Sequence, residues 1–380
     1  MTYARARLWL GITGVGSLVT LCTIALLVGL PAQLLSADPV FRTAQVYQLA
    51  CVAAFFVLWL MPLDYLGGFL LPRKFGKSSD SFAKWFTGYL PAAIAQASLF
   101  ILFGLSILVL SQTWGTVGGI IAVTSGVVAC SALRKQWVLR RESTSDSSAK
   151  KLLDAIALIQ SWEIFVPRTI VVNHQDVGFT GGIIGLGRTA KIIVPKTWLK
   201  FPTEQLATAI ARRAMAINSG SYTRGLAIAL VWNVCGFLLC AMLPGAGLTS
   251  VASLLTTICG FTLWSFVGLL TLPTASRNAS LSIDQLLIKQ GTPADLISDT
   301  AYEMDQLQDG EPERPALIET IFHPVPNVAS RKGVHPVTGF EAWNVARTTL
   351  FFSWACLGFL SRSVHCNIGR PELWTMLPTD

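Results

Sequence analysis

Long apolar stretches alternate with polar ones along the chain, and this alternation predicts a polytopic helical membrane protein. A helix needs about 20 apolar residues to cross the hydrocarbon core of a bilayer. A shorter apolar stretch, 346–361, predicts either a tilted seventh span or a helix at the membrane interface. Six stretches are long enough to span: 8–30, 48–71, 88–111, 115–133, 225–247 and 250–272.

Two long polar regions, 134–222 and 273–345, flank the hairpin of spans at 223–272 and therefore emerge side by side. The first contains 13 Lys and Arg against 6 Asp and Glu, and the second contains 5 against 10. Their net charges of +7 and −5 favour docking of the two regions into one composite domain. Two independent loops are the alternative. Region 1–133 is then a four-span membrane region, and 346–380 holds the short seventh segment and a polar tail.

Apolar spacing inside the polar regions predicts a mixed α+β fold. Lys150–Trp162 has the periodicity of an amphipathic helix, whereas Thr169–Asn173 and Lys191–Val194 read as strands. The glycine-rich stretch Gly178–Gly187 between them predicts a turn. Three further helices are predicted at 203–217, 280–289 and 294–306.

Composition and charge support a membrane location and give an orientation. The chain is 52% hydrophobic and 13% charged, whereas soluble domains carry about 25% charged residues. Lys and Arg are enriched at the N-terminus, in loop 72–87 and in segment 134–151, whereas loop 31–47 contains only Arg42. The positive-inside rule therefore predicts a multi-pass protein of the cytoplasmic (inner) membrane, with its N-terminus and its polar domain on the cytoplasmic side. The net charge of +8 reflects this topology and not nucleic-acid binding; the lipid bilayer is the predicted surrounding.

The predicted helix at 203–217 contains the sequence EQLATAIARRAMAI and has the frame of a zinc-protease helix. In that helix an HExxH motif places two zinc-binding histidines four residues apart, and the glutamate acts as general base. Here the same slots hold Arg212, Arg213 and Ala216. None of these side chains can bind zinc or act as that base, and the four histidines of the chain show no pair at helical spacing elsewhere.

Several segments around this helix resemble the HtpX-type membrane zinc metallopeptidases, relatives of the CaaX prenyl proteases. The resemblance covers about 165–331 and implies a zincin-like domain whose edge strand holds a peptide by strand addition. It would place that peptide along Phe179, Gly181, Ile192 and Ile193. The matching segments are FTGG at 179–182, EQLATAIA at 204–211, SRNASLSIDQ at 276–285 and HPVPNVASR at 323–331.

The chain departs from this family at each position that would carry the chemistry. The resemblance assigns the histidine ligands to Arg212 and Ala216, the general base to Arg213 and the glutamate ligand to Ser280. A zinc site needs three or four Cys, His, Asp or Glu ligands. We therefore predict no catalytic residue, no metal ligand and no cofactor, although the family itself implies zinc.

Two residues of the family's SRxxExxAD segment are retained, namely Arg277 and Asp284. In the family this aspartate supports a ligand histidine. We hypothesise that Asp284 now pairs with Arg212 or Arg213, so that a guanidinium replaces the positive charge of the metal. The alternative is that both arginines are solvated.

A carboxylate inside a predicted span, Asp64, is a further candidate because intramembrane charges usually have a partner or a function. Structural pairing and a role in transport both remain open for it. The polar tail at 363–380 is interpreted either as a folded cap or as a partner site, and it would end outside if the seventh segment spans.

These features predict a membrane-embedded pseudoprotease that binds or regulates membrane proteins. The implied partners are membrane-protein substrates or an active homologous protease. Three alternatives stay open: an active peptidase with a non-standard site, a transporter, and a membrane scaffold without a peptide groove.

Overall fold

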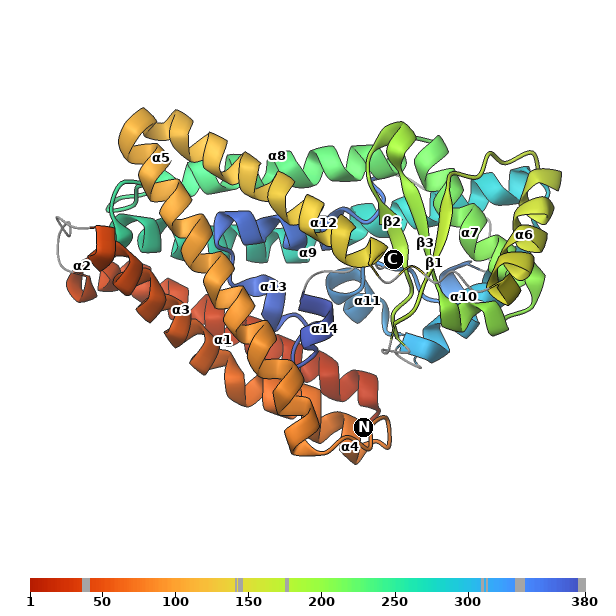
Figure 1. The fold of residues 1–380 in the computed structure, drawn as a ribbon, viewed down its shortest axis with the longest axis horizontal. Coiled ribbons are helices and arrows are strands. Elements are labelled where there is room, and N and C mark those ends of the chain that lie inside the picture. The colour runs from red at the N-terminus through yellow and green to blue at the C-terminus, as the bar shows by residue number, and fades with distance from the viewer. Residues whose placement is uncertain are drawn as a thin grey trace. The chain divides into compact units, whose positions relative to one another are not determined.

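The protein is described by a computed structural model that covers residues 1–35, 42–140, 142, 146–174, 178–308, 311, 314–331 and 339–374 (Figure 1). The chain forms two compact units, each assembled from segments that are distant in sequence. The first unit comprises Met1–Ser131, Leu230–Gly268 and Thr349–Thr375. The second comprises Ala132–Ala229 and Leu269–Thr348.

Five helices of the described chain are long and apolar enough to cross a membrane, so the prediction of a multi-pass helical protein is confirmed. The second of them continues from α3 through a π-helical turn, η1 (Leu66–Leu70), into α4 (Leu71–Lys74). A short helix, α2 (Leu30–Leu34), follows the first. The five are α1 (Tyr3–Leu27), α3 (Arg42–Tyr65) with its continuation, α5 (Phe82–Leu139), α8 (Ser221–Ala241) and α9 (Val251–Lys289).

Helix α5 contains both predicted spans 88–111 and 115–133, and a sharp turn separates them (Figure 1). Trp114 and Gly115 leave helical geometry, and Gly115 has a φ of +58°, which an L side chain rarely adopts. A Cβ at Gly118 would lie 1.9 Å from the Leu110 carbonyl oxygen. The two glycines therefore allow one limb of α5 to fold back against the other.

The seventh apolar segment does not form a spanning helix. Helix α12 (Val345–Phe352) has 8 residues, which at 1.5 Å per residue gives about 12 Å, less than half of a bilayer core of about 30 Å. A 3-10 turn, η5 (Ser353–Cys356), follows, and Leu357 has a φ of +59°. Two one-turn helices, α13 (Leu360–Ser363) and α14 (Pro371–Trp374), complete the described tail.

The second unit contains a small mixed sheet. Strand β3 (Lys191–Pro195) pairs in parallel with β1 (Thr169–Val172) and antiparallel with β2 (Gly182–Ile184), so β3 is the central strand of the described sheet. The two strands expected from the sequence are present. The predicted turn at Gly178–Gly187 was wrong in part, because the stretch contains the strand β2, which is three residues long and fully buried.

Helix α7 (Thr203–Asn218) lies at the centre of the core of this unit. Every residue from Leu206 to Ala216 is buried, since the helix packs against α6 (Asp146–Ser161), α10 (Ala294–Gln308) and β3. Trp198 and Ile283 belong to the same core cluster. Shorter elements complete the unit: α11 (Ala316–Phe322) and the 3-10 turns η2 (Gly187–Thr189), η3 (Lys196–Lys200) and η4 (Ala329–Arg331).

Candidate functional site

The middle of α7 carries two consecutive buried arginines, Arg212 and Arg213, which are 7% and 1% exposed. Consecutive helical residues point about 100° apart, so the two guanidinium groups reach different partners. A buried charge is costly unless it is paired and hydrogen-bonded. The partners of each arginine therefore define what this part of the core can do.

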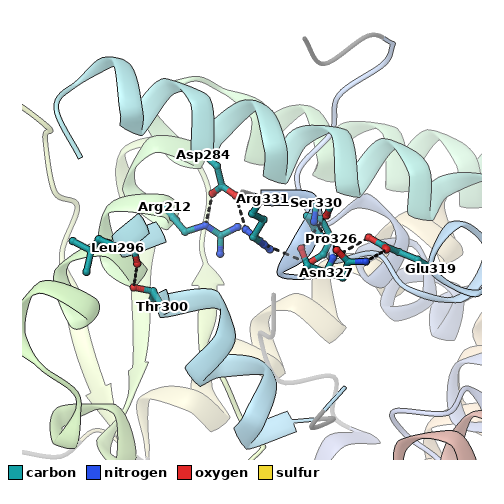
Figure 2. Close-up of polar contacts among 9 residues, drawn as sticks. All are labelled: Arg212, Asp284, Leu296, Thr300, Glu319, Pro326, Asn327, Ser330 and Arg331. Atoms are coloured by element: carbon teal, nitrogen blue, oxygen red, sulfur yellow. Dashed lines mark hydrogen bonds and ion pairs between the residues drawn. The ribbon is translucent and has the colours of Figure 1, made fainter. Parts of the chain in front are cut away.

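Arg212 forms an ion pair with Asp284 of α9. Its Nε donates to Oδ1 of Asp284 at 2.7 Å, and both side chains are buried. Arg331 of η4 approaches the same carboxylate from the other side, and its Nη1 donates to Oδ2 at 2.5 Å (Figure 2). The predicted contact between Asp284 and Arg212 is thus present, and Arg331 is a third member that sequence reasoning missed.

The Arg212–Asp284–Arg331 cluster contains two guanidinium groups for one carboxylate. The pKa of Arg331 is lowered from 12.5 to about 10, chiefly because the buried charged form loses hydration and in part because Arg212 repels it. Asp284 and the more distant Glu319 act in the opposite direction. At neutral pH the three side chains therefore carry a surplus of one positive charge.

Arg213 has a different role from its neighbour. Its Nη1 donates to the carbonyl of Ile193 at 2.8 Å, and its Nη2 donates to the carbonyl of Thr180 at 2.5 Å. The guanidinium carbon also lies 4.6 Å from the ring centroid of Trp198. The residue in the position of the general base thus ties α7 to the sheet through backbone carbonyls, and of the two candidate arginines it is Arg212 that contacts Asp284.

The other candidate positions in α7 and α9 are also buried. Ala216 is packed in the core, and Ser280 is 7% exposed. Arg277 does not reach Asp284: its Nη1 donates to the carbonyls of Glu319, Thr320 and His323 at 2.5–3.0 Å. These carbonyls end helix α11, so Arg277 acts as a C-terminal cap.

A chain of contacts leads from this cap to Arg331 (Figure 2). The Glu319 carboxylate accepts from the backbone and side-chain nitrogens of Asn327. Asn327 Oδ1 in turn accepts from the backbone N–H of Ser330 at 2.7 Å. This turn fixes Arg331 at Asp284. A basic residue at the end of the HPVPNVASR match was the available signal for it.

The four residues expected along a peptide-binding edge lie in the interior, so this prediction was wrong. Ile192 and Ile193 belong to the central strand β3, and both are fully buried. Phe179 belongs to a core cluster. A Cβ at Gly181 would lie 2.1 Å from the Ile193 carbonyl oxygen. The family resemblance implied an edge at this strand, whereas β2, which the sequence analysis did not predict, pairs with β3 on that side.

Strand β2 itself is partly covered. The Ile183 carbonyl accepts from Arg134 Nη2 at 3.1 Å and lies 3.5 Å from the Tyr222 hydroxyl. The Tyr222 hydroxyl also donates to the Gly185 carbonyl at 3.1 Å. Side-chain donors thus occupy carbonyls that an added strand would need.

The side chains in the positions of the expected zinc ligands do not fit a zinc ion. Arg212 and Arg213 are cationic donors, Ala216 offers a methyl group, and Ser280 offers a hydroxyl, whereas zinc requires Cys, His, Asp or Glu ligands. Asp284 gives one oxygen to each of two guanidinium groups. Within the residues that the structure describes, no three His, Cys, Asp or Glu side chains are grouped to hold a metal; His335 lies outside them.

In the first unit, Asp64 is fully buried and pairs with Arg362 of α13. Its Oδ2 accepts from Arg362 Nε at 3.0 Å, and its Oδ1 accepts from the Gly369 N–H at 2.8 Å. Arg362 also donates to Gln96 and Tyr89, both at 2.8 Å. The two partners are 298 positions apart in the sequence, so the spacing of residues gave no signal for this pair.

The C-terminal tail returns to the end of the helices at which α1 begins. Arg7 donates to the carbonyls of Gly67, His365 and Ile368 at 2.8–3.0 Å. The tail is therefore a folded part of the first unit, as one of the two interpretations held. Because α12 is too short to span, the condition under which the tail would end outside is not met.

No protein-family model matches the chain. A search of curated proteins also finds no match. Among solved structures, the chain is similar to the crystal structure of Ste24p from S. mikatae, with a TM-score of 0.59 and 12% sequence identity. The similarity covers 83% of this chain and 80% of that one. At this identity the likeness concerns the fold alone.

Proposed function

We propose that the chain is a membrane-embedded pseudoprotease of the HtpX type, with a zincin-like domain that faces the cytoplasm and acts by binding or regulating membrane proteins. The fold-level likeness to Ste24p supports the family relation. The observation that carries the proposal is the Arg212–Asp284–Arg331 cluster, which stands where the resemblance places the metal.

The cluster replaces a metal in its structural role. A bound metal would link side chains of α7 and α9 and neutralise nearby carboxylates. Here Arg212 links α7 to Asp284 of α9, and Arg331 adds η4 to the same link. Arg213 meanwhile connects α7 to the sheet. The domain thereby holds α7, α9, η4 and the sheet together with its own charges.

Metal analysis combined with a proteolysis assay tests this proposal. The purified full chain is expected to contain far less than one zinc per molecule and to leave casein and a membrane-protein reporter uncut. Stoichiometric zinc together with cleavage would overturn the proposal and favour an active peptidase with a non-standard site.

Restoring the family's residues provides a second test. The variant Arg212→His, Arg213→Glu, Ala216→His and Ser280→Glu is expected to bind zinc. Because Arg213 holds the carbonyls of Ile193 and Thr180, folding of the variant is first checked by its thermal midpoint with and without zinc. A folded variant that binds no zinc would argue against the alignment with the zinc-protease helix.

A membrane scaffold is the second candidate, and the covered position of β3 favours it. A scaffold would contact partners through its spans, whereas a pseudoprotease would contact them through its polar domain. A photo-crosslinking residue at exposed Leu186, beside β2, is compared with one at exposed Leu102 of α5. Crosslinks to membrane proteins from position 186 support the pseudoprotease; crosslinks from position 102 alone support the scaffold.

A further inference from the structure

We infer that Arg212, supported by Arg331, forms a binding site for a carboxylate group of a peptide. This inference rests on the proposed function, because it names the chemistry that the former metal site would recognise in a bound membrane-protein segment. It concerns side chains that all belong to the second unit.

The first argument is the charge balance. Two arginines share one carboxylate at 2.7 and 2.5 Å, and both arginines are at least nine-tenths buried. Buried charges are normally balanced, since an unpaired buried charge is strongly destabilising. A monoanion would neutralise the surplus charge, whereas a dianion such as phosphate would create a negative surplus.

The second argument is the geometry of the Arg212 guanidinium. Its Nε is used by Asp284, and no described residue accepts a hydrogen bond from either terminal nitrogen. In Figure 2 the Arg212 guanidinium lies beside the side chain of Arg331, and the contact drawn from it is the one with Asp284. Two parallel N–H groups of a guanidinium match the two oxygens of a carboxylate.

Two other buried arginines of the second unit use their terminal nitrogens differently. Arg213 and Arg277 direct their terminal nitrogens at backbone carbonyls of their own unit. Both Arg212 and Arg213 have an indole ring nearby: the guanidinium carbon of Arg212 lies 5.7 Å from the ring centroid of Trp343, and that of Arg213 lies 4.6 Å from the ring centroid of Trp198. An aromatic face beside a guanidinium fork suits the carboxylate of a peptide, which carries apolar groups next to the charge.

Binding measurements on the full chain in detergent micelles test the site. The probes are sodium acetate, inorganic phosphate and chloride at equal ionic strength, followed by N-acetyl-trileucine and its C-terminal amide. We expect acetate to raise the thermal midpoint more than phosphate or chloride does. We expect the free acid of the peptide to bind at least tenfold more tightly than the amide.

Variants then locate the effect. Arg212→Gln is expected to remove the preference for the acid, and Arg212→Lys to retain only part of it because lysine lacks the fork. Arg224→Gln is the matched control, since Arg224 is exposed and donates to the Glu341 carbonyl. Its preference for the acid is expected to equal that of the unaltered chain.

Three results would overturn the inference: equal binding of acid and amide, an acid preference that survives Arg212→Gln, or a stronger response to phosphate than to acetate. An absence of any response to acetate and to the acid peptide would also overturn it. None of these results bears on zinc content or proteolysis, so the proposed function can stand when this site fails. Zinc with cleavage would remove the proposed function whatever the anion binding shows.

Discussion

The two units each bury an aspartate with arginine, but the two clusters are balanced differently. In the first unit Asp64 has one guanidinium, that of Arg362, and the remaining polar groups are neutral. In the second unit Asp284 has two guanidinium groups and no second carboxylate in direct contact. The charges of the first cluster cancel, whereas the second cluster has a surplus positive charge among the residues described.

This difference shows that a buried ion pair can be fully used in holding the fold together or can keep hydrogen-bond donors for another group. The guanidinium carbon of Arg362 lies 4.0 Å from the ring centroid of Trp374, and the group donates hydrogen bonds to Gln96 and Tyr89. Its hydrogen-bonding capacity is therefore used within the fold. Such saturation supports the structural interpretation of Asp64 over a role in transport. Arg212 keeps two terminal nitrogens available while Arg331 already neutralises Asp284. The fold therefore depends on Arg362 more than on Arg212.

The largest expected effect follows from removing Arg362. Arg362→Gln leaves the Asp64 carboxylate uncompensated and is expected to lower the free energy of unfolding by about 3–5 kcal/mol. Arg212→Gln leaves Asp284 paired with Arg331 and is expected to cost at most about 1 kcal/mol. Unfolding in mixed micelles measures both variants, with exposed Lys74→Met as the control. Equal losses in the two arginine variants would contradict the distinction between the clusters.

A slightly smaller effect is expected from removing the shared carboxylate of the second cluster. Asp284→Asn leaves Arg212 and Arg331 facing each other and is expected to cost about 3 kcal/mol. Adding Arg212→Gln to Asp284→Asn removes one of the repelling charges, so the double variant should be more stable than the single one. A double-mutant cycle on the free energy of unfolding measures this coupling. Additive losses would show that the two arginines do not repel each other.

The membrane-spanning helices could be predicted from the sequence, but the ion pair between Asp64 and Arg362 in the first unit could not. Apolar length identified α1, α3, α5, α8 and α9, because a span is a local property. Asp64 and Arg362 meet only after the tail folds back, and no local pattern encodes that return.

The candidate site was predictable to a similar extent. The frame of α7 pointed to Arg212 and Asp284, whereas Arg331 depends on a turn held by Asn327 and Glu319. The peptide edge failed for a local reason: three residues at 182–184 are too few to show strand periodicity among glycines. Because β2 was not predicted, β3 was expected at the edge of the sheet, whereas it is the central strand.

A moderate effect is expected from disturbing the backbone around Asp64 without changing charge. A Cβ at Gly68 would lie 1.9 Å from the Gly369 carbonyl oxygen, and Gly369 donates to Asp64. Gly68→Ala should therefore separate the tail from α3 and lower the free energy of unfolding by about 1–3 kcal/mol. Gly88→Ala is the control, because nothing lies within 4 Å of its Cβ position. Equal stability of the two variants would mean that the tail adjusts and does not need this close approach.

The smallest effect is expected from pH, and it tests whether the second cluster remains charged. The pKa of Arg331 is lowered from 12.5 to about 10, so between these values the unfolded chain binds more protons and stability rises with pH. Below about pH 9 the group is protonated in both states. The difference in thermal midpoint between Arg331→Gln and the unaltered chain should therefore be constant from pH 6 to pH 9 and change only above that range. A slope between pH 6 and pH 8 would show that a group with a near-neutral pKa is coupled to the cluster, which would contradict a surplus charge carried by arginine alone.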